Sequence, residues 1–249
     1  MTTTATPTPT TTRVPMTSLR KTALVAGLFY VLTFVSIPTL AMYGPVHDPN
    51  YIVGSGPDGG VLFGGVLEII VALAGIGTAV TLYPVLKRQN EAMALGLVSA
   101  RILEGALIFA GVASLLTIVT LRRAGTGDDA LIAGQALAAL YDRTFFVSQS
   151  LIPALNGLLL GTLMYRSRLV PRWLPVLGLI GAALLTSSNA AILFGVWPAM
   201  SAQAGLAALP IATWEFSLGV WLIVKGFRPS PITAGMDAAG TSGMERGAV

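Results

Sequence analysis

The sequence predicts an all-α integral membrane protein, a bundle of six transmembrane helices. Only 10% of its 249 residues are charged and 54% are hydrophobic, and the mean hydropathy is +0.76. A soluble domain carries about 25% charged residues, so this chain cannot cover a water-facing surface of ordinary composition. Six separate apolar segments are also each long enough to cross a bilayer, which takes about 20 residues of helix.

The six segments divide the chain into a membrane domain and two tails. We expect spanning helices at about residues 21–43, 61–83, 93–119, 145–165, 173–197 and 205–225. Together they form a membrane domain over residues 19–228. Residues 1–18, rich in Thr and Pro, and residues 229–249, rich in Gly and Ala, contain little that can be buried, so both are predicted to be disordered tails.

The connections between the helices differ in character. Three prolines, Pro45, Pro49 and Pro57, lie among glycines after the first segment and predict a loop there. Residues 128–144 instead place leucines at helical spacing between small and polar residues. That pattern fits either a short amphipathic helix at the membrane interface or an extension of the fourth spanning helix, and both interpretations stay open.

The basic residues indicate an orientation. With the N-terminus in the cytoplasm, 11 of the 15 Lys and Arg residues fall in cytoplasmic segments, and only Arg122, Arg123 and Arg143 fall in outer loops. Because cytoplasmic loops of membrane proteins are enriched in Lys and Arg, both termini are predicted to be cytoplasmic. The same distribution explains the net charge of +4 without a nucleic-acid partner. The basic side chains are spread over short turns, where they meet anionic lipid headgroups.

Strongly polar residues recur near the middle of five of the six predicted helices. The stretch "SARILEGAL" puts Arg101 and Glu104 one turn apart on one face of the third helix. At 1.5 Å per residue, Glu104 lies roughly 3 Å from the midpoint of that helix. The other members of this layer are Glu68 in the second helix, Asn156 in the fourth, Asn189 in the fifth and Glu215 in the sixth.

Such residues are costly in hydrocarbon. Each charged side chain at a helix centre costs about 2.5–3.5 kcal/mol on insertion scales, so the four ionisable groups must face one another or water inside the bundle. Arg101 can neutralise only one of the three glutamates, which leaves two that must be protonated, bind a cation or contact water. The layer therefore fits a small proton- or ion-coupled transporter in which Glu68, Arg101, Glu104, Asn156, Asn189 and Glu215 bind a small ligand, proton or cation.

The alternative is a structural or regulatory membrane protein. Buried ion pairs can fix helix packing or partner binding without transporting anything. The sequence does not decide between these interpretations, and it leaves the substrate, the protonation of the glutamates and a homo-oligomer open.

Few residues are available for catalysis. The chain has no cysteine, and its one histidine, His47, falls in a predicted outer loop. Zinc sites draw mainly on His and Cys, and no nucleotide-binding or nucleophile-elbow motif occurs, so we predict no catalytic residues, no metal and no cofactor.

Several stretches together resemble a bacterial family of six-helix membrane proteins known as domain of unknown function 4386. They are "RKTALVAGLFYVLTFVSIP", "ARILEGAL", "YRSRLVPRWLPVLGLIG" and "ALPIATWEFSLGVWLIVKGF", within about residues 20–228. The resemblance implies an integral membrane bundle in a bacterial plasma membrane, with Arg101, Glu104 and Glu215 as signature positions. It implies no activity, substrate or cofactor.

Overall fold

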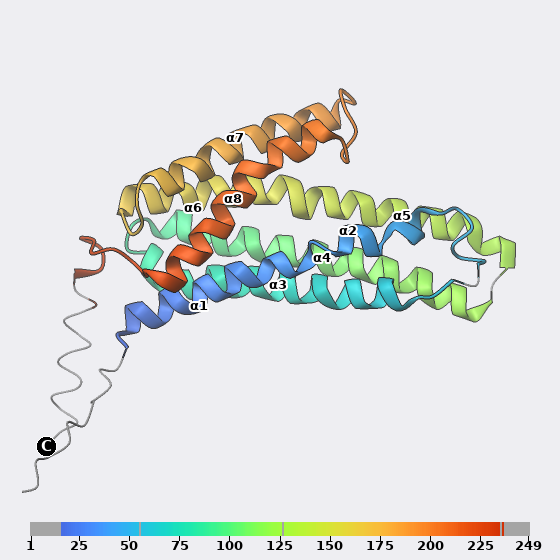
Figure 1. Cartoon of the computed structure of the whole chain (residues 1–249), viewed down its shortest axis with the longest axis horizontal. Helices are drawn as coiled ribbons and strands as arrows, with labels where there is room; N and C mark the ends of the chain where they lie inside the picture. Colours follow the sequence, from blue (N-terminus) through green and yellow to red (C-terminus); the bar gives the residue numbers. More distant parts are fainter. Residues whose placement is uncertain (1–15, 55, 126, 235, 237–249) are drawn as a thin grey trace, which may run out of the picture.

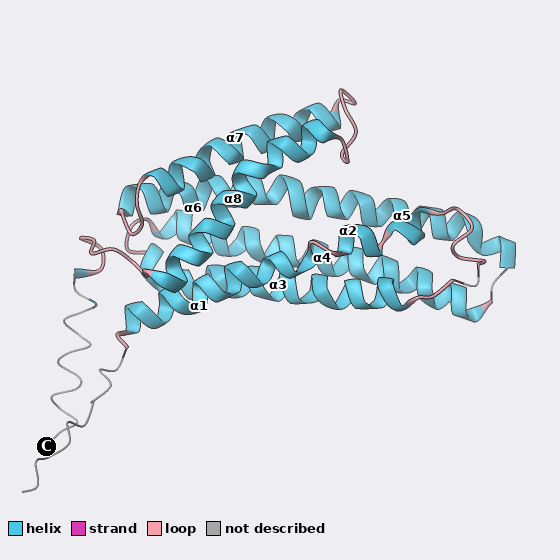
Figure 2. Ribbon diagram, in the orientation of Figure 1, coloured by secondary structure: helices cyan, strands magenta, loops and turns pink. Residues whose placement is uncertain are grey.

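The computed structural model describes residues 16–234 and 236, apart from residues 55 and 126, and these described residues are helical with no strand (Figures 1 and 2). Six helical segments are long and apolar enough to cross a membrane, which confirms the predicted fold class. They are α1 with its 3₁₀ extension, α3, α4, α5 continued by α6, α7 and α8. Their bounds are Ser18–Ser36, Gly59–Leu86, Glu91–Ala124, Ala130–Ser167, Trp173–Leu193 and Ala202–Val224.

The first span is shorter and less regular than residues 21–43. The helix α1 (Ser18–Leu32) passes into a 3₁₀ turn over Thr33–Ser36, and only the short α2 (Thr39–Met42) and a 3₁₀ turn over Gly44–His47 follow. Pro38 removes a backbone donor and restricts the residue before it. The Thr33 and Ser36 hydroxyls also bond to carbonyl groups three residues earlier, which competes with the helical ladder.

Nearly all of the segment 128–144, from Ala130 onward, is part of the fourth span. The helix α5 (Ala130–Phe146) continues through a π-helical turn, Val147–Leu151, directly into α6 (Ile152–Ser167). A single interrupted helix therefore replaces the separate interfacial helix, the other interpretation of this stretch.

Local signals explain where the helices begin and end. Side chains of Thr17, Asn90 and Ser201 accept hydrogen bonds from the first turns of α1, α4 and α8. A glycine in the left-handed conformation, Gly125, follows α4 (Glu91–Ala124). Pro210 lies inside α8 (Ala202–Val224), which continues through it as helix.

The helices form two groups (Figure 1). α3, α4 and the α5–α6 rod run side by side along the length of the molecule, with α1 beside them in one half, and α7 (Trp173–Leu193) and α8 form a tilted hairpin over that same half. α8 packs on α1 and α7 packs on α6. We call the end near residues 16 and 234 the terminal end and the opposite one the far end.

The terminal end is closed by the start of the predicted C-terminal tail. Ser230 is buried and its hydroxyl donates to the Ser167 carbonyl oxygen over 2.5 Å, while the Arg228 amide donates to Leu169 over 2.7 Å. Ile232 and Met236 pack against the core. These residues are ordered on the bundle because they satisfy carbonyl groups left open after α6. Residues 1–15 and 237–249 of the predicted tails lie outside the described part of the chain.

Candidate functional site

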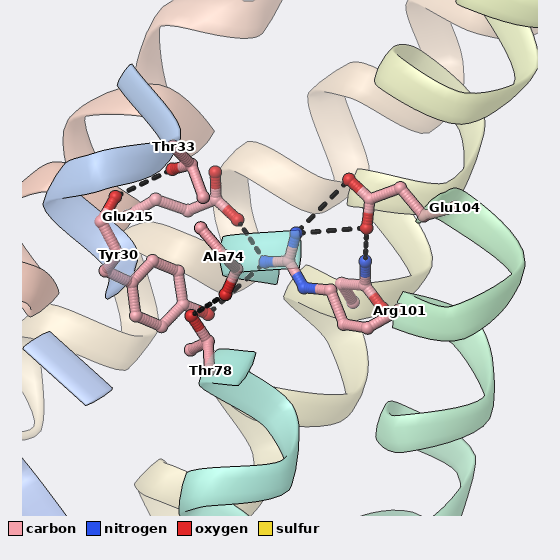
Figure 3. A network of polar contacts seen from close by, with 8 residues as sticks. Tyr30, Thr33, Ala74, Thr78, Arg101, Glu104 and Glu215 are labelled. Carbon is pink, nitrogen blue, oxygen red and sulfur yellow. Dashed lines mark hydrogen bonds and ion pairs between the residues drawn. The ribbon is translucent and has the colours of Figure 1, made fainter. Parts of the chain in front are cut away.

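A charged network joins three helices in the middle of the bundle, with Arg101 of α4 at its centre (Figure 3). Arg101 Nη1 lies 3.0 Å from Glu104 Oε2, and its Nη2 lies 2.9 Å from Glu215 Oε1 of α8. Asn156 of α6 donates from Nδ2 to Glu104 Oε2 over 2.8 Å. The structure thus brings together four of the six predicted site residues. Two of them lie on α4, one on α6 and one on α8.

The surroundings hold the guanidinium in place. Arg101 is 5% exposed, and its carbon Cζ lies 5.7 Å from the centre of the Tyr30 ring in α1. Arg101 Nη2 also donates to the Tyr30 hydroxyl over 3.4 Å. A guanidinium offers several donors in a fixed plane, so one arginine can bridge two carboxylates and still contact an aromatic ring. Arg101 thereby connects α4 to α8 and α1.

Glu68 lies apart from this network. It is 1% exposed on α3 (Gly59–Leu86), and its Oε1 accepts a hydrogen bond of 2.8 Å from the hydroxyl of Tyr141 in α5. The Tyr141 ring meets Tyr43 edge to face, with 5.2 Å between the ring centres. Glu68 is therefore paired with a neutral donor and not with Arg101.

Asn189 is also separate. It is fully buried on α7, and its Oδ1 accepts a hydrogen bond of 2.5 Å from Ser150 in the π-helical turn. Its Nδ2 has no partner among the described side chains and backbone groups. The Ser150 contact indicates that Asn189 joins α7 to the π-helical turn. Asparagines in membrane helices commonly form such interhelical hydrogen bonds.

Sequence reasoning missed two tyrosines that complete these sites. Tyr30 supports Arg101 and Tyr141 supports Glu68. Tyr30 lies in an apolar helical stretch and Tyr141 at the end of one, and a buried hydroxyl needs a partner. That signal was present in the sequence, but it could not say which carboxylate each hydroxyl would reach.

The network forms the floor of a large cavity. Arg101, Glu104 and Glu215 all line a cavity of about 1150 Å³ between the 3₁₀ turn Thr33–Ser36, α3, α4, α5, the π-helical turn, α7 and α8. Exposed residues such as Ile37, Val196 and Met200 also line it, so it reaches the surface in the far half. Small-molecule sites usually measure about 300–1,000 Å³, so this cavity can hold a ligand with water around it.

Toward the terminal end, the same bundle is filled. Leu82, Leu97, Leu160, Leu163 and Leu218 are at most 2% exposed and belong to one core between the network and that end. The floor of the cavity therefore has polar groups on its far side and close-packed side chains on its terminal side. Within the described residues no group of three His, Asp or Glu side chains is placed to hold a metal ion.

Fold and site together define a helical, multi-pass membrane protein with a charged cavity between its spans. The chain belongs to the family described as domain of unknown function DUF4386, whose model matches residues 25–226. The family match covers every helix of the bundle apart from short terminal segments. No curated protein and no solved structure matches the chain.

Proposed function

We propose that the protein is a small proton- or cation-coupled transporter of a bacterial plasma membrane, with both termini in the cytoplasm. One observation carries the proposal: the Arg101 network separates a cavity that reaches the surface in the far half from a packed core toward the terminal end. A site reached from one side and sealed from the other is what one state of an alternating-access transporter requires.

The charge balance of the network supplies the coupling step. Two carboxylates, Glu104 and Glu215, face one guanidinium that keeps its proton, so one negative charge remains to be balanced by a proton or a cation. Glu104 also accepts a hydrogen bond from Asn156, whereas Glu215 has Arg101 as its one described polar partner. Glu215 is therefore the carboxylate that we assign to the exchanged proton or cation.

The same contact provides a mechanical link. The Glu215–Arg101 pair joins α8 to α4 across the cavity floor. Protonating Glu215 or giving it another cation removes the attraction that holds this pair together. The α7–α8 hairpin, which is tilted against the other helices, is the element that would then move (Figure 1).

The test is proton movement in proteoliposomes. The full chain would be reconstituted with a trapped pH-sensitive dye, and an imposed pH gradient would be followed with Na⁺ or K⁺ as the opposing cation. We expect the protein to dissipate the gradient at least tenfold faster than empty vesicles, and Glu104→Gln and Glu215→Gln to remove most of that rate. Glu91→Gln is the matched control, because Glu91 lies at the surface, outside the cavity, where Tyr83 donates to it.

Two outcomes would overturn the proposal. One is a wild-type rate equal to that of empty vesicles, and the other is a rate that both cavity variants leave unchanged. If these variants instead lower the melting temperature of a protein that moves no protons, the structural interpretation of the network replaces the transporter.

A further inference from the structure

The walls of the cavity are mostly apolar and partly aromatic. They include Phe34, Val71, Ile108, Phe146, Leu185 and Trp197. A site for a bare inorganic cation would be lined by oxygen atoms, because these replace the water molecules that surround the cation in solution. A cavity of about 1150 Å³ with these walls fits the apolar body of an organic molecule.

The floor favours a positive ligand. Its three charged groups are two carboxylates and one guanidinium, and only the Oε1 oxygen of Glu215 is used by Arg101. At this floor, an anion would have to displace Glu104 or Glu215 from Arg101, which both carboxylates already contact. A cation needs no such displacement, because it can approach the Glu215 carboxylate from the open cavity.

Polar groups on the walls point independently to a ligand. The Tyr43 hydroxyl, the Ser188 hydroxyl and the Trp197 indole nitrogen are buried and have no partner among the described residues, and all three residues line the cavity. Tyr43 is 3% exposed and Ser188 is 2% exposed. Buried polar groups in native proteins nearly always have a hydrogen-bond partner. These three groups are therefore available to bind a ligand in the cavity.

We propose that the cavity binds amphipathic organic monocations, with the apolar body between the aromatic walls and the positive charge at Glu215. Aromatic faces add to the attraction because they are negative above and below the ring. The proposal names the substrate class of the site assigned above, and as a transport substrate it rests on the proposed function.

The test uses two probes of the same shape and opposite charge. Tetraphenylphosphonium and tetraphenylborate would be titrated into the purified full chain in lipid nanodiscs, with protein-free nanodiscs subtracted. We expect saturable binding of the phosphonium and at least tenfold weaker binding of the borate. Glu215→Gln should weaken phosphonium binding at least tenfold, while the surface variant Glu91→Gln should leave it unchanged.

A second variant keeps the test independent of the charged network. Ala212→Phe fills part of the cavity beside Glu215 and leaves both carboxylates in place. It should also weaken phosphonium binding at least tenfold. Equal binding of both probes, or phosphonium binding that neither variant changes, would overturn the proposal.

The two proposals fail separately. Phosphonium binding that depends on Glu215 in a protein that moves no protons would support the ligand class and reject the transporter. Proton movement that depends on Glu215 without saturable phosphonium binding would reject the ligand class and leave the transporter standing.

Discussion

Between the Arg101 network and the terminal end the helices pack through buried side chains, whereas between the network and the far end a cavity lies beside a second, smaller core on α3, α4 and α5. In the packed half, α1 and α8 approach so closely that a Cβ atom added to Gly27 would lie 2.7 Å from the Gly219 carbonyl oxygen. In the far half, polar pairs such as Glu68–Tyr141 and Ser150–Asn189 connect the helices. The cavity is what distinguishes the far half from the packed half, and the network lies between the two.

Removing the charge at this boundary should have the largest effect. Arg101→Met leaves Glu104 and Glu215 buried without their counter-charge, and breaking a buried ion pair costs about 3–5 kcal/mol. For a chain of this size we expect the melting temperature to fall by more than about 6 °C. Thermal unfolding in detergent or nanodiscs measures it, and Lys21→Met is the surface control.

An unchanged melting temperature for Arg101→Met would mean that the two halves do not depend on the network that separates them.

The effect of one added methyl group on stability should differ between the packed half and the far half. Gly27→Ala pushes against backbone atoms of α8, and overpacking of this kind costs about 1–3 kcal/mol. Gly205→Ala is the matched change on the cavity side, where nothing lies within 4 Å of the added atom. It should be neutral or should stabilise the helix by up to about 1 kcal/mol. Equal losses in both variants, measured by thermal unfolding, would contradict the contrast in packing.

The Glu68 pair should be a smaller and independent contribution of the far half. Tyr141→Phe removes the described hydrogen-bond donor to Glu68, and an unpartnered buried group costs about 1–3 kcal/mol. Because Glu68 and Glu215 share no partner, Tyr141→Phe and Glu215→Gln should add within about 0.5 kcal/mol. A double-mutant cycle on unfolding free energies measures this, and strong coupling would show that the two acids form one site after all.

The smallest effect should come from an exposed pair at the cavity, in which His47 Nε2 lies 2.9 Å from Asp142 Oδ1. The hydrogen bond that His47 donates to the Asp142 carboxylate raises the pKa of His47 above 6.5, although partial burial opposes it. A raised folded-state pKa means that the pair stabilises the protein fully below about pH 6.5 and stops doing so as the pH rises through the raised pKa. An exposed pair is worth about 0.2–1 kcal/mol, so Asp142→Asn should lower the melting temperature slightly at pH 5.5 and not at pH 8.5.

A loss for Asp142→Asn that is equal at both pH values would show that the protonated histidine does not contribute through this pair.

The sequence was enough for the fold and for part of the site. Hydropathy and segment length predicted six spanning helices, since both are set by the thickness of the bilayer. The i,i+3 spacing of Arg101 and Glu104 predicted that they could pair, which the structure confirms. That Glu215 and Asn156 meet them depends on how α6 and α8 rotate about their axes, and no local pattern in a mostly apolar helix specifies that rotation.

Other features were beyond the reach of periodicity. Glu68 and Asn189 have the same mid-helix signal as Glu215, yet Tyr141 and Ser150 bind them elsewhere. The order of residues 228–234 depends on carbonyl groups after α6 that only the packed structure leaves open.

The π-helical turn at Val147–Leu151 lets one rod serve both halves of the bundle. A turn of this kind corresponds to one additional residue in an α-helix, and one residue rotates everything after it by roughly 100°. Tyr141 before the turn can therefore face Glu68 while Asn156 after it faces Glu104, within one rod. Deleting one residue from this turn would rotate α6 against α5, so that Tyr141 and Asn156 could no longer both reach their carboxylates.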